Sequence, residues 1–136
     1  MTSPRACPFC APAPDATLAE SAYSRAVRDR YPLALGHTLV VPRRHVKSVF
    51  ELSQDEWDDL WALVRRMRAE VPALRDADGV NVGFNHREAA GQTVEHAHVH
   101  MIPRTRGDVA DPRGGIRWVI PERADYWSNR PAGEGT

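Results

Sequence analysis

Three histidines, His96, His98 and His100, occur at strict two-residue spacing and make up half of the six histidines in the chain. Imidazole titrates near neutral pH, so it can serve as an acid, a base, a metal ligand or a nucleophile. Small or apolar residues alternate with the histidines, which predicts a half-buried strand with the three imidazoles on one face, rooted about 6.6 Å apart. A merely solvated face or an adventitious metal patch is the alternative. Three histidines in one alternation favour a chemical role over either of these two alternatives.

A pair of cysteines forms the second group of interest. Cys7 and Cys10 stand in a Cys-Pro-Phe-Cys segment and are the only cysteines in the chain. This spacing is typical of either a metal knuckle or a redox pair. A redox pair is expected to open a helix after a buried strand, whereas here nothing strand-like precedes the pair and an Ala-Pro-Ala-Pro segment follows. We therefore expect zinc.

The segments around the histidines match a known pattern. Gly91-Gln92-Thr93-Val94 precedes them and Ile102-Pro103-Arg104 follows. Together these residues resemble the histidine triad superfamily of nucleotidyl hydrolases and transferases, in its zinc-bearing bacterial form, from Cys7 to about Ile102. The resemblance implies an α+β fold, with an antiparallel sheet of about five strands and one long amphipathic helix packed on it. It also implies a homodimer in which two helices and two sheet edges meet.

The same resemblance implies how the histidines act. It assigns nucleophilic attack on the α-phosphorus of a nucleotide to His98, whose neutral imidazole would form a nucleotidyl-imidazole intermediate that water then hydrolyses. His100 would donate a hydrogen bond to a phosphoryl oxygen or to the leaving group. His96 belongs to the same catalytic set.

Further residues match positions that contact the substrate in the family. The expected substrate-binding set is Phe9, Val27, Asp29, His37, Asn85, Gln92 and Thr93. Thr93 and Asn85 would lie at the phosphate, and Asp29 would accept hydrogen bonds from both ribose hydroxyls. Phe9 and Val27 would line the base pocket. Without the family, Asp29 is equally explained as the start of a turn, and Phe9 and Val27 as ordinary core.

Zinc needs four ligands at tetrahedral geometry, and the two cysteines supply two of them. In zinc-bearing members of the superfamily, the histidine after the Pro-x-x turn and the first triad histidine complete the set. The resemblance therefore implies a structural zinc ion bound by Cys7, Cys10, His45 and His96. Two features depart from the pattern. The segments around the triad suggest the fragile-histidine-triad branch, which generally lacks the cysteines, and Leu35 stands where proline is usual.

Hydrophobic periodicity predicts the elements that position these residues. Residues 54–70 carry apolar side chains at helical spacing after a capping box that begins at Ser53, and residues 38–41 and 80–84 are typical strands. The alanines of residues 18–29 favour a helix by propensity. The fold that the resemblance implies has a hairpin of two strands there, and we expect the hairpin.

Two tryptophans, Trp57 and Trp61, give the predicted helix a large apolar load. Core packing explains them by default, and a dimer interface is the functional alternative.

Composition limits the class of protein. The chain has 136 residues, with 18 Lys plus Arg against 18 Asp plus Glu, so no global positive field directs it to nucleic acid. We expect one domain at residues 1–127 and a flexible tail at residues 128–136, because the tail has no apolar anchor. No apolar run approaches the roughly 18 residues of a membrane span, so we expect a cytoplasmic protein without a membrane partner.

The expected activity is hydrolysis or transfer at the α-phosphate of a small-molecule nucleotide, in particular a dinucleoside polyphosphate such as diadenosine tetraphosphate. A second enzyme activity that fits the residues is hydrolysis of nucleoside phosphoramidates or adenylylated amines. A third possibility, from another class, is a nucleotide- or zinc-binding scaffold without turnover. The three-histidine face argues against the scaffold, because binding alone requires no nucleophile.

Overall fold

The structure is a computed structural model that describes residues 7–128 and divides the chain into two compact units, Met1–Thr105 and Arg106–Thr136. The expected flexible tail lies outside the described residues except for Ser128. The expected domain boundary after residue 127 stays a prediction.

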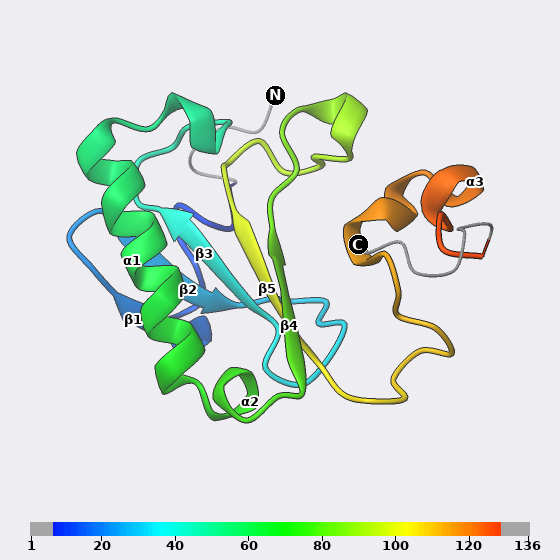
Figure 1. Ribbon diagram of the computed structural model, residues 1–136. Helices are drawn as coiled ribbons and strands as arrows, with labels where there is room; N and C mark the ends of the chain where they lie inside the picture. Colours follow the sequence, from blue (N-terminus) through cyan, green and yellow to red (C-terminus); the bar gives the residue numbers. More distant parts are fainter. Residues whose placement is uncertain (1–6, 129–136) are drawn as a thin grey trace. The chain divides into compact units, whose positions relative to one another are not determined.

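The first unit is built on one antiparallel sheet of five strands (Figure 1). Their order across the sheet is β1-β2-β3-β5-β4, so β1 and β4 are the edges. The predicted α+β class and the sheet of about five strands are confirmed. The strands are β1 (Thr17–Glu20), β2 (Ser24–Arg28), β3 (Thr38–Pro42), β4 (Gly79–Gly83) and β5 (Val99–Arg104).

Strands β1 and β2 form the hairpin that competed with a helix in the sequence analysis. Every residue of β3 is buried, and β2 pairs with β3 along its whole length, from Ser24 opposite Pro42 to Arg28 opposite Thr38. Ala26 in β2 is fully buried, and its small side chain lets a second layer approach the sheet closely. Pairing with a buried central strand therefore overrides the helix propensity of alanine.

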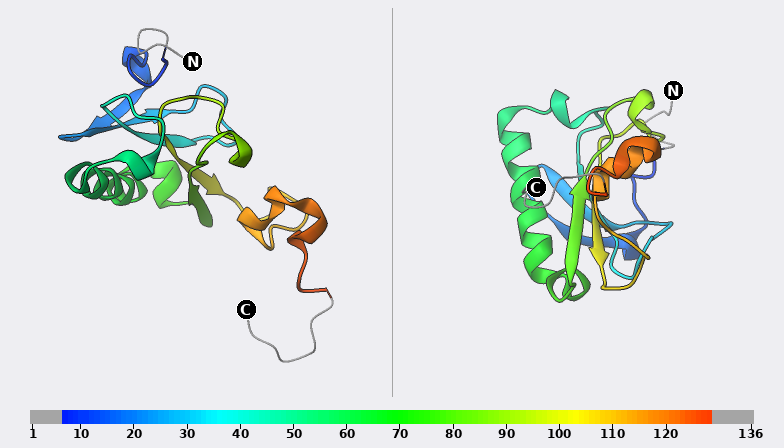
Figure 2. Two further views of the ribbon diagram at one scale, coloured as in Figure 1. Left: turned by 90° about the horizontal axis from the view of Figure 1, so that it is seen from above. Right: turned by 45° about the vertical axis from the view of Figure 1, so that its right-hand side comes forward.

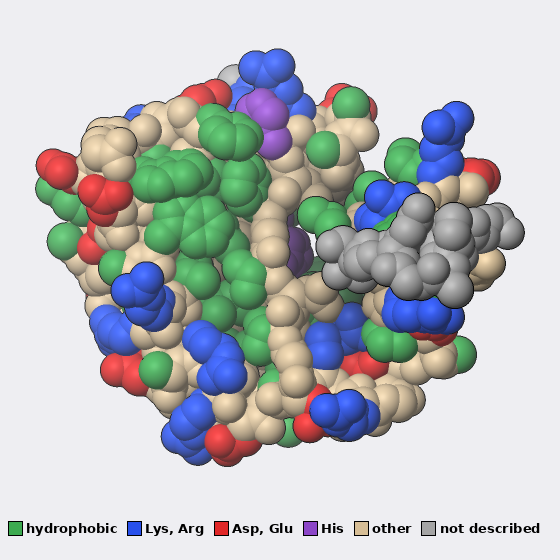
Figure 3. Space-filling model, in the orientation of Figure 1, with side chains coloured by type: hydrophobic (Ala, Val, Ile, Leu, Met, Phe, Trp, Pro, Cys, Tyr) green, Lys and Arg blue, Asp and Glu red, His purple; other side chains and the backbone are tan. Residues whose placement is uncertain are grey.

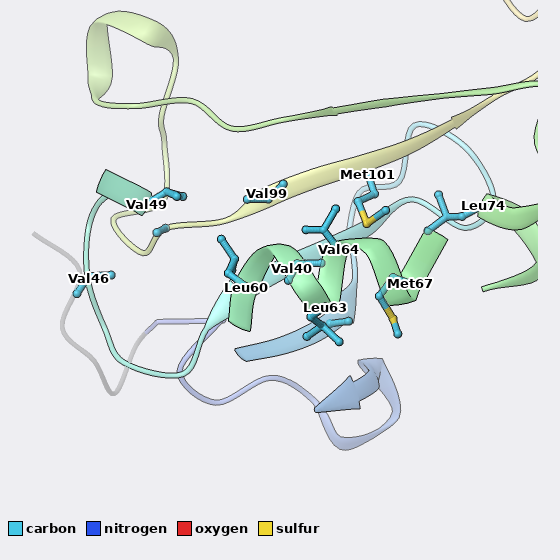
Figure 4. Packing of buried hydrophobic residues seen from close by; sticks show 12 residues of the cluster. Val40, Val46, Val49, Leu60, Leu63, Val64, Met67, Leu74, Val99 and Met101 are labelled. Carbon is cyan, nitrogen blue, oxygen red and sulfur yellow. The ribbon is translucent and has the colours of Figure 1, made fainter. Parts of the chain in front are cut away.

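Helix α1 (Gln54–Glu70) covers one face of the sheet (Figures 1 and 2), with the bounds that the sequence predicts. The hydroxyl of Ser53 accepts the N–H of Glu56 at 3.2 Å, and the Glu56 carboxylate accepts the N–H of Ser53 at 3.0 Å, which completes the predicted capping box. Each apolar side chain that α1 buries against the sheet contributes roughly 1.5–3 kcal/mol to stability. These side chains (Figure 4) are Leu60, Leu63, Val64 and Met67.

The opposite face of the sheet is covered by the N-terminal segment. Val40 in β3 belongs to the core under α1, whereas its neighbours Leu39 and Val41 belong to a second cluster with Cys7 and Phe9. Successive side chains of a strand point to opposite faces, so a fully buried strand needs cover on both sides. The segment that carries the two cysteines supplies the second cover.

Short helical turns, which the sequence did not predict, connect these elements. They are η1 (Pro14–Ala16), η2 (Val49–Glu51), α2 (Pro72–Arg75) and η3 (Glu88–Ala90). Within residues 7–128, no helix has the length and apolar character needed to cross a membrane.

The second unit contains η4 (Gly115–Val119) and α3 (Pro121–Ala124). Nε of Arg117 donates to the carbonyl of Ala124 at 3.0 Å, and its guanidinium lies 4.6 Å from the ring centre of Tyr126. Arg113 lies 4.8 Å from the ring centre of Trp127. Arginine–aromatic contacts thus contribute to the packing of this unit.

We expect Gly36→Ala to destabilise the protein. Gly36 has φ +92°, and a Cβ atom there would collide with the side chain of Ala73 in α2. Backbone strain and overlap together should lower the free energy of unfolding by about 2–4 kcal/mol in urea denaturation. Gly83→Ala is the control, because nothing lies within 4 Å of its added Cβ. Equal stability of the two variants would contradict the expectation.

Candidate active site and metal site

The histidine triad lies at the beginning of β5 and just before it. The strand starts at Val99, so only His100 lies within it, and the expected strand through all three histidines is wrong at its beginning. Pairing with β3 begins only at Val99, and upstream the N–H of Ala97 donates to the carbonyl of Val46 at 2.7 Å instead. The alternation continues nevertheless, since Ala97, Val99 and Met101 are at most 2% exposed, as the sequence predicts.

The backbone holds the ring of His98 in one orientation. Its Nδ1 lies 2.8 Å from the carbonyl oxygen of His96, which can only accept, so Nδ1 carries the proton. In the neutral ring the lone pair is then on Nε2. The ring also contacts those of Phe9, with centres 5.0 Å apart, and His100, at 5.2 Å. An imidazole in this state is prepared for nucleophilic attack through Nε2.

His100 ends a hydrogen-bonded chain that runs through His37. The N–H of Leu33 donates to Nδ1 of His37 at 3.1 Å, so a neutral His37 carries its proton on Nε2. That nitrogen lies 2.9 Å from Nδ1 of His100 and 3.3 Å from Oδ2 of Asp29. When His37 donates to His100, the neutral ring of His100 carries its own proton on Nε2. His98 and His100 then offer opposite groups, a lone pair and a donor.

Burial keeps these rings neutral near pH 7. Burial, with smaller contributions from His98 and His37, lowers the pKa of His100 to about 4. Burial also lowers the pKa of His37, and the charge of Asp29 opposes this shift. His100 is therefore a hydrogen-bond donor rather than a strong acid at neutral pH.

The residues expected at the nucleoside have partners within the protein. Oδ1 of Asp29 accepts the N–H of Tyr31 at 2.8 Å, and Oδ2 faces His37. The alternative turn role of Asp29 is therefore present, and its contact with ribose stays a prediction. Phe9 and Val27 are buried in the cluster on the cysteine side of the sheet, and their contact with a base also stays a prediction.

Gln92 braces the loop between β4 and the triad. Its Nε2 donates to the carbonyls of Lys47, at 2.6 Å, and Val94, at 3.0 Å, while its Oε1 accepts the N–H of Arg87 at 2.9 Å. The amide thus supports the backbone, and its expected contact with the substrate stays a prediction. Thr93 lines a pocket of about 640 Å³ beside this loop.

Asn85, expected at the phosphate, is exposed at the beginning of the loop after β4. Two further residues of this loop, His86 and Arg87, were not predicted from the sequence. His86 follows, and its Nδ1 lies 2.7 Å from the buried hydroxyl of Ser48. Arg87 has a positive φ of 74°. The sequence feature that could have pointed to His86 is that it is a histidine outside the triad. The residue type of Arg87 does not indicate a strained backbone.

The four predicted zinc ligands converge. Nδ1 of His45 and Nδ1 of His96 are 3.1 Å apart, and Sγ of Cys10 lies 3.2 and 3.5 Å from them. With Zn–N of 2.0–2.1 Å and Zn–S of 2.3 Å, ligand atoms around a tetrahedral zinc are about 3.3–3.8 Å apart, so the donors fit zinc after small adjustments. Both cysteines are free thiols. The ligand atoms that lie within 4.8 Å of one another belong to Cys7, Cys10, His45 and His96.

The tautomer of His96 also suits a metal ligand. His96 is fully buried, and its Nε2 donates to the carbonyl of Pro42 at 2.7 Å, which leaves Nδ1 for a metal. Burial lowers the pKa of His96 to about 4. Burial and the neighbouring Cys7 raise the pKa of Cys10 to about 11, and a bound cation would reverse that shift.

A second cluster also brings possible metal ligands together. The ligand atoms of Asp29, His37 and His100 lie within 4.8 Å of one another. There the chain of hydrogen bonds through His37 already accounts for their proximity.

We expect stability to fall below about pH 6.5, in part through His100. Folding lowers its pKa from 6.5 to about 4, so the unfolded chain binds the proton first as pH falls. The stability that depends on neutral His100 is complete above pH 6.5 and is lost as pH falls towards 4, at most about 3 kcal/mol. Urea denaturation between pH 7.5 and 4.5 should show a shallower pH dependence for His100→Gln than for wild type. Parallel curves would contradict this assignment.

Comparison with known proteins places these features in a family. The HIT domain family pattern matches residues 11–107. A bis(5′-adenosyl)-triphosphatase of Dictyostelium discoideum is 40% identical over 77 residues, which are 57% of this chain and 52% of that protein. The chain thus spans about half the length of this relative. An adenosine 5′-monophosphoramidase of Schizosaccharomyces pombe is 35% identical over 91 residues, which are 67% of this chain and 65% of that protein.

Solved structures give the same result. The crystal structure of a Zn-bound histidine triad family protein from Mycobacterium smegmatis superposes with a TM-score of 0.69 at 32% identity. The match covers 80% of this chain and 82% of that one. The matched pattern includes the triad, the loop before it and the whole sheet. The chain therefore belongs to the HIT domain family, the family of the histidine triad.

Proposed function

We propose that this protein hydrolyses or transfers nucleotides at the α-phosphate through His98, with dinucleoside polyphosphates such as diadenosine tetraphosphate as its substrates. The observation that carries this proposal is that two neighbouring imidazoles have opposite tautomers. His98 offers a lone pair on Nε2, and His100 offers an N–H. Nucleophilic substitution at phosphorus uses both groups, because one attacks the phosphorus and the other donates a hydrogen bond to the oxygen that becomes more negative.

In the proposed reaction, Nε2 of His98 bonds to the α-phosphorus while the bond to the bridging oxygen breaks. The leaving group keeps the electron pair of that bond, and the N–H of His100 stabilises its negative charge. Water then attacks the phosphorus, the P–N bond breaks and its electrons return to Nε2. One proton of the water is released, and neutral His98 is regenerated.

The neutrality of His100 favours a phosphate leaving group over an amine. With its pKa lowered to about 4, the ring donates a hydrogen bond at pH 7 but does not readily supply a proton. A phosphate departs as a stable anion and needs only the hydrogen bond, whereas an amine must gain a proton as it departs. Nucleoside phosphoramidates are the second candidate substrates, supported by the similarity to the Schizosaccharomyces pombe phosphoramidase.

Steady-state rates on diadenosine polyphosphates, adenosine 5′-phosphoramidate and nucleoside diphosphates, with identified products, test the substrate class. We expect kcat/KM for diadenosine tetraphosphate to exceed that for the phosphoramidate by about tenfold or more. The reverse order would support the phosphoramidase. Turnover of no substrate would support the scaffold without catalysis.

We expect His98→Asn to abolish turnover and to leave nucleotide binding largely unchanged, because the residue supplies covalent chemistry rather than most of the binding contacts. Single-turnover rates should fall by several orders of magnitude, while the Kd for AMP from calorimetry changes little. His100→Gln retains a side-chain donor and should lose much less. A His98→Asn variant that keeps a tenth of the wild-type rate would refute the nucleophile.

One structural zinc ion per chain, bound by Cys7, Cys10, His45 and His96, is part of this proposal. The ion would supply folding free energy by tying the N-terminal segment to the residues before β5. Metal analysis of the purified protein should give one zinc per chain, and Cys7→Ser with Cys10→Ser should remove it and lower the Tm. Zinc retained by the double variant, or a disulfide in the native protein, would refute the site.

A homodimer would complete the apolar surface around α1. Strand β4 is an edge of the sheet, and Val82 in it is 45% exposed. Hydrophobic side chains gather beside it (Figure 3), where the rings of Phe50, Trp57, Trp61 and Phe84 contact one another. Such an exposed patch next to an unpaired strand edge favours association with a second copy.

Light scattering at micromolar concentration should therefore give twice the 15.2 kDa mass of the chain. Val82→Glu should yield the monomer, because it puts a charge into the expected interface. Leu35→Glu is the control, since Leu35 is 93% exposed in the same unit, in the loop between β2 and β3, and is not one of the patch residues. A monomeric wild type would exclude the dimer.

The cytoplasm is the proposed location. Free thiols suited to zinc are typical of a reducing compartment, and both cysteines are free.

A further inference from the structure

A pocket of about 640 Å³ lies beside the loop that follows β4, and no step of the reaction proposed above is assigned to it. One wall begins at Lys47, next to Val46, whose carbonyl accepts the N–H of Ala97. Ala97 directly precedes His98, so this wall is joined to the segment that carries the nucleophile. The lining residues are Lys47, Ser48, Glu51, His86, Arg87, Glu88, Gln92, Thr93 and Glu95.

Arg87 has a strained backbone in this pocket. Its φ of 74° and ψ of 167° lie in a region that is almost exclusive to glycine. The surrounding loop enforces this conformation, because the N–H of Arg87 donates to the side chain of Gln92 and its carbonyl accepts the N–H groups of Ala90 and Gln92. Glycine would satisfy the same loop without strain. Strain at a non-glycine residue that lines a pocket points to a use for its side chain.

The pocket lining carries two cations, Lys47 and Arg87, together with the carboxylates of Glu51, Glu88 and Glu95, and Arg87 is the cation outside the ion pair described next. Nζ of Lys47 lies 3.9 Å from the carboxylate of Glu95. Glu51 acts electrostatically on Arg44, whose pKa is raised chiefly by its hydrogen bond with Glu56. Glu88 adjoins Arg87 and adds a negative charge to the lining.

His86 is another of the residues that line this pocket. Its Nδ1 is held by the hydroxyl of Ser48 at 2.7 Å, and its ring meets that of Phe50 edge to face, with centres 5.0 Å apart. The hydroxyl of Ser48 also accepts the N–H of Phe50, which fixes its position. The ring of His86 is thus held by two neighbours, and its Nε2 is the nitrogen left for a ligand.

We propose that this pocket binds the phosphates of the leaving group, with Arg87 as their cationic contact and Nε2 of His86 as a second donor. The inference rests on the proposed function and extends it, because it makes the polyphosphate half of the substrate a recognised part. A guanidinium matches phosphate oxygens in charge and geometry. An uncharged leaving group, such as the ammonia of a phosphoramidate, gains nothing from this contact.

Calorimetry on the His98→Asn protein tests the pocket without turnover, with AMP and ATP as probes in the absence of magnesium. ATP carries two phosphates beyond the α-phosphate, so its affinity relative to AMP measures the pocket. We expect ATP to bind more tightly than AMP, and Arg87→Gln to reduce the ratio of the two affinities by about tenfold. Glu88→Gln should increase the ratio, because it removes a negative charge from the same lining. AMP binding should be unchanged in both.

Arg87→Gly separates the side chain from the strain. It should reduce the ATP to AMP ratio as Arg87→Gln does, yet raise the Tm by about 2–4 °C, because glycine relieves the backbone. If Arg87→Gln leaves the ratio of the ATP and AMP affinities unchanged, the pocket is not a phosphate site. If the protein nevertheless binds AMP and shows turnover, the proposed function stands. Absence of AMP binding and of turnover would instead overturn the proposed function, and this inference with it.

Discussion

The buried imidazole of His96 lies between the cluster of possible zinc ligands and His98, the proposed nucleophile. One of its nitrogens donates to the carbonyl of Pro42 at the end of β3, and the other faces the two cysteines and His45. Its main-chain carbonyl accepts a hydrogen bond from Nδ1 of His98 and so leaves Nε2 as the free nitrogen of that ring. A buried polar ring costs free energy unless both nitrogens are satisfied. Folding of the N-terminal segment onto the sheet and the orientation of the His98 ring therefore depend on the same residue.

Enclosure of β3 on both faces explains the electrostatics of the site. Cover by α1 on one side and by the cysteine segment on the other removes water from the strands that flank the histidines. Burial then disfavours the imidazolium forms and lowers the pKa values of His96 and His100 to about 4. Neutral rings have one donor and one acceptor each, so their tautomers are fixed by their partners. The hydrophobic packing of the sheet thus favours the neutral forms of His96 and His100.

Local sequence patterns predicted the elements that depend on interactions between residues close in sequence. The capping box at Ser53 and the apolar periodicity gave both ends of α1, and alternation predicted the buried residues around the triad. The start of β5 was wrong because it depends on where β3 stops pairing, which no local pattern contains. The hairpin at residues 18–29 came from family resemblance against helix propensity. Gln92 was expected at the substrate, but the backbone groups that its amide binds are known only once the loop has folded.

The site has three supports that can change independently. The main chain before β5 orients His98, the loop before β3 sets the proton of His100 through His37, and Gln92 braces the loop that lines the pocket. The residues of the pocket loop take part in neither of the hydrogen bonds that orient the rings of His98 and His100. The proposed recognition of the leaving group is therefore separable from the proposed attack on the phosphorus. A triphosphatase and a phosphoramidase are both among the relatives, which is compatible with similar histidines whose protonation and neighbouring loop together select the leaving group.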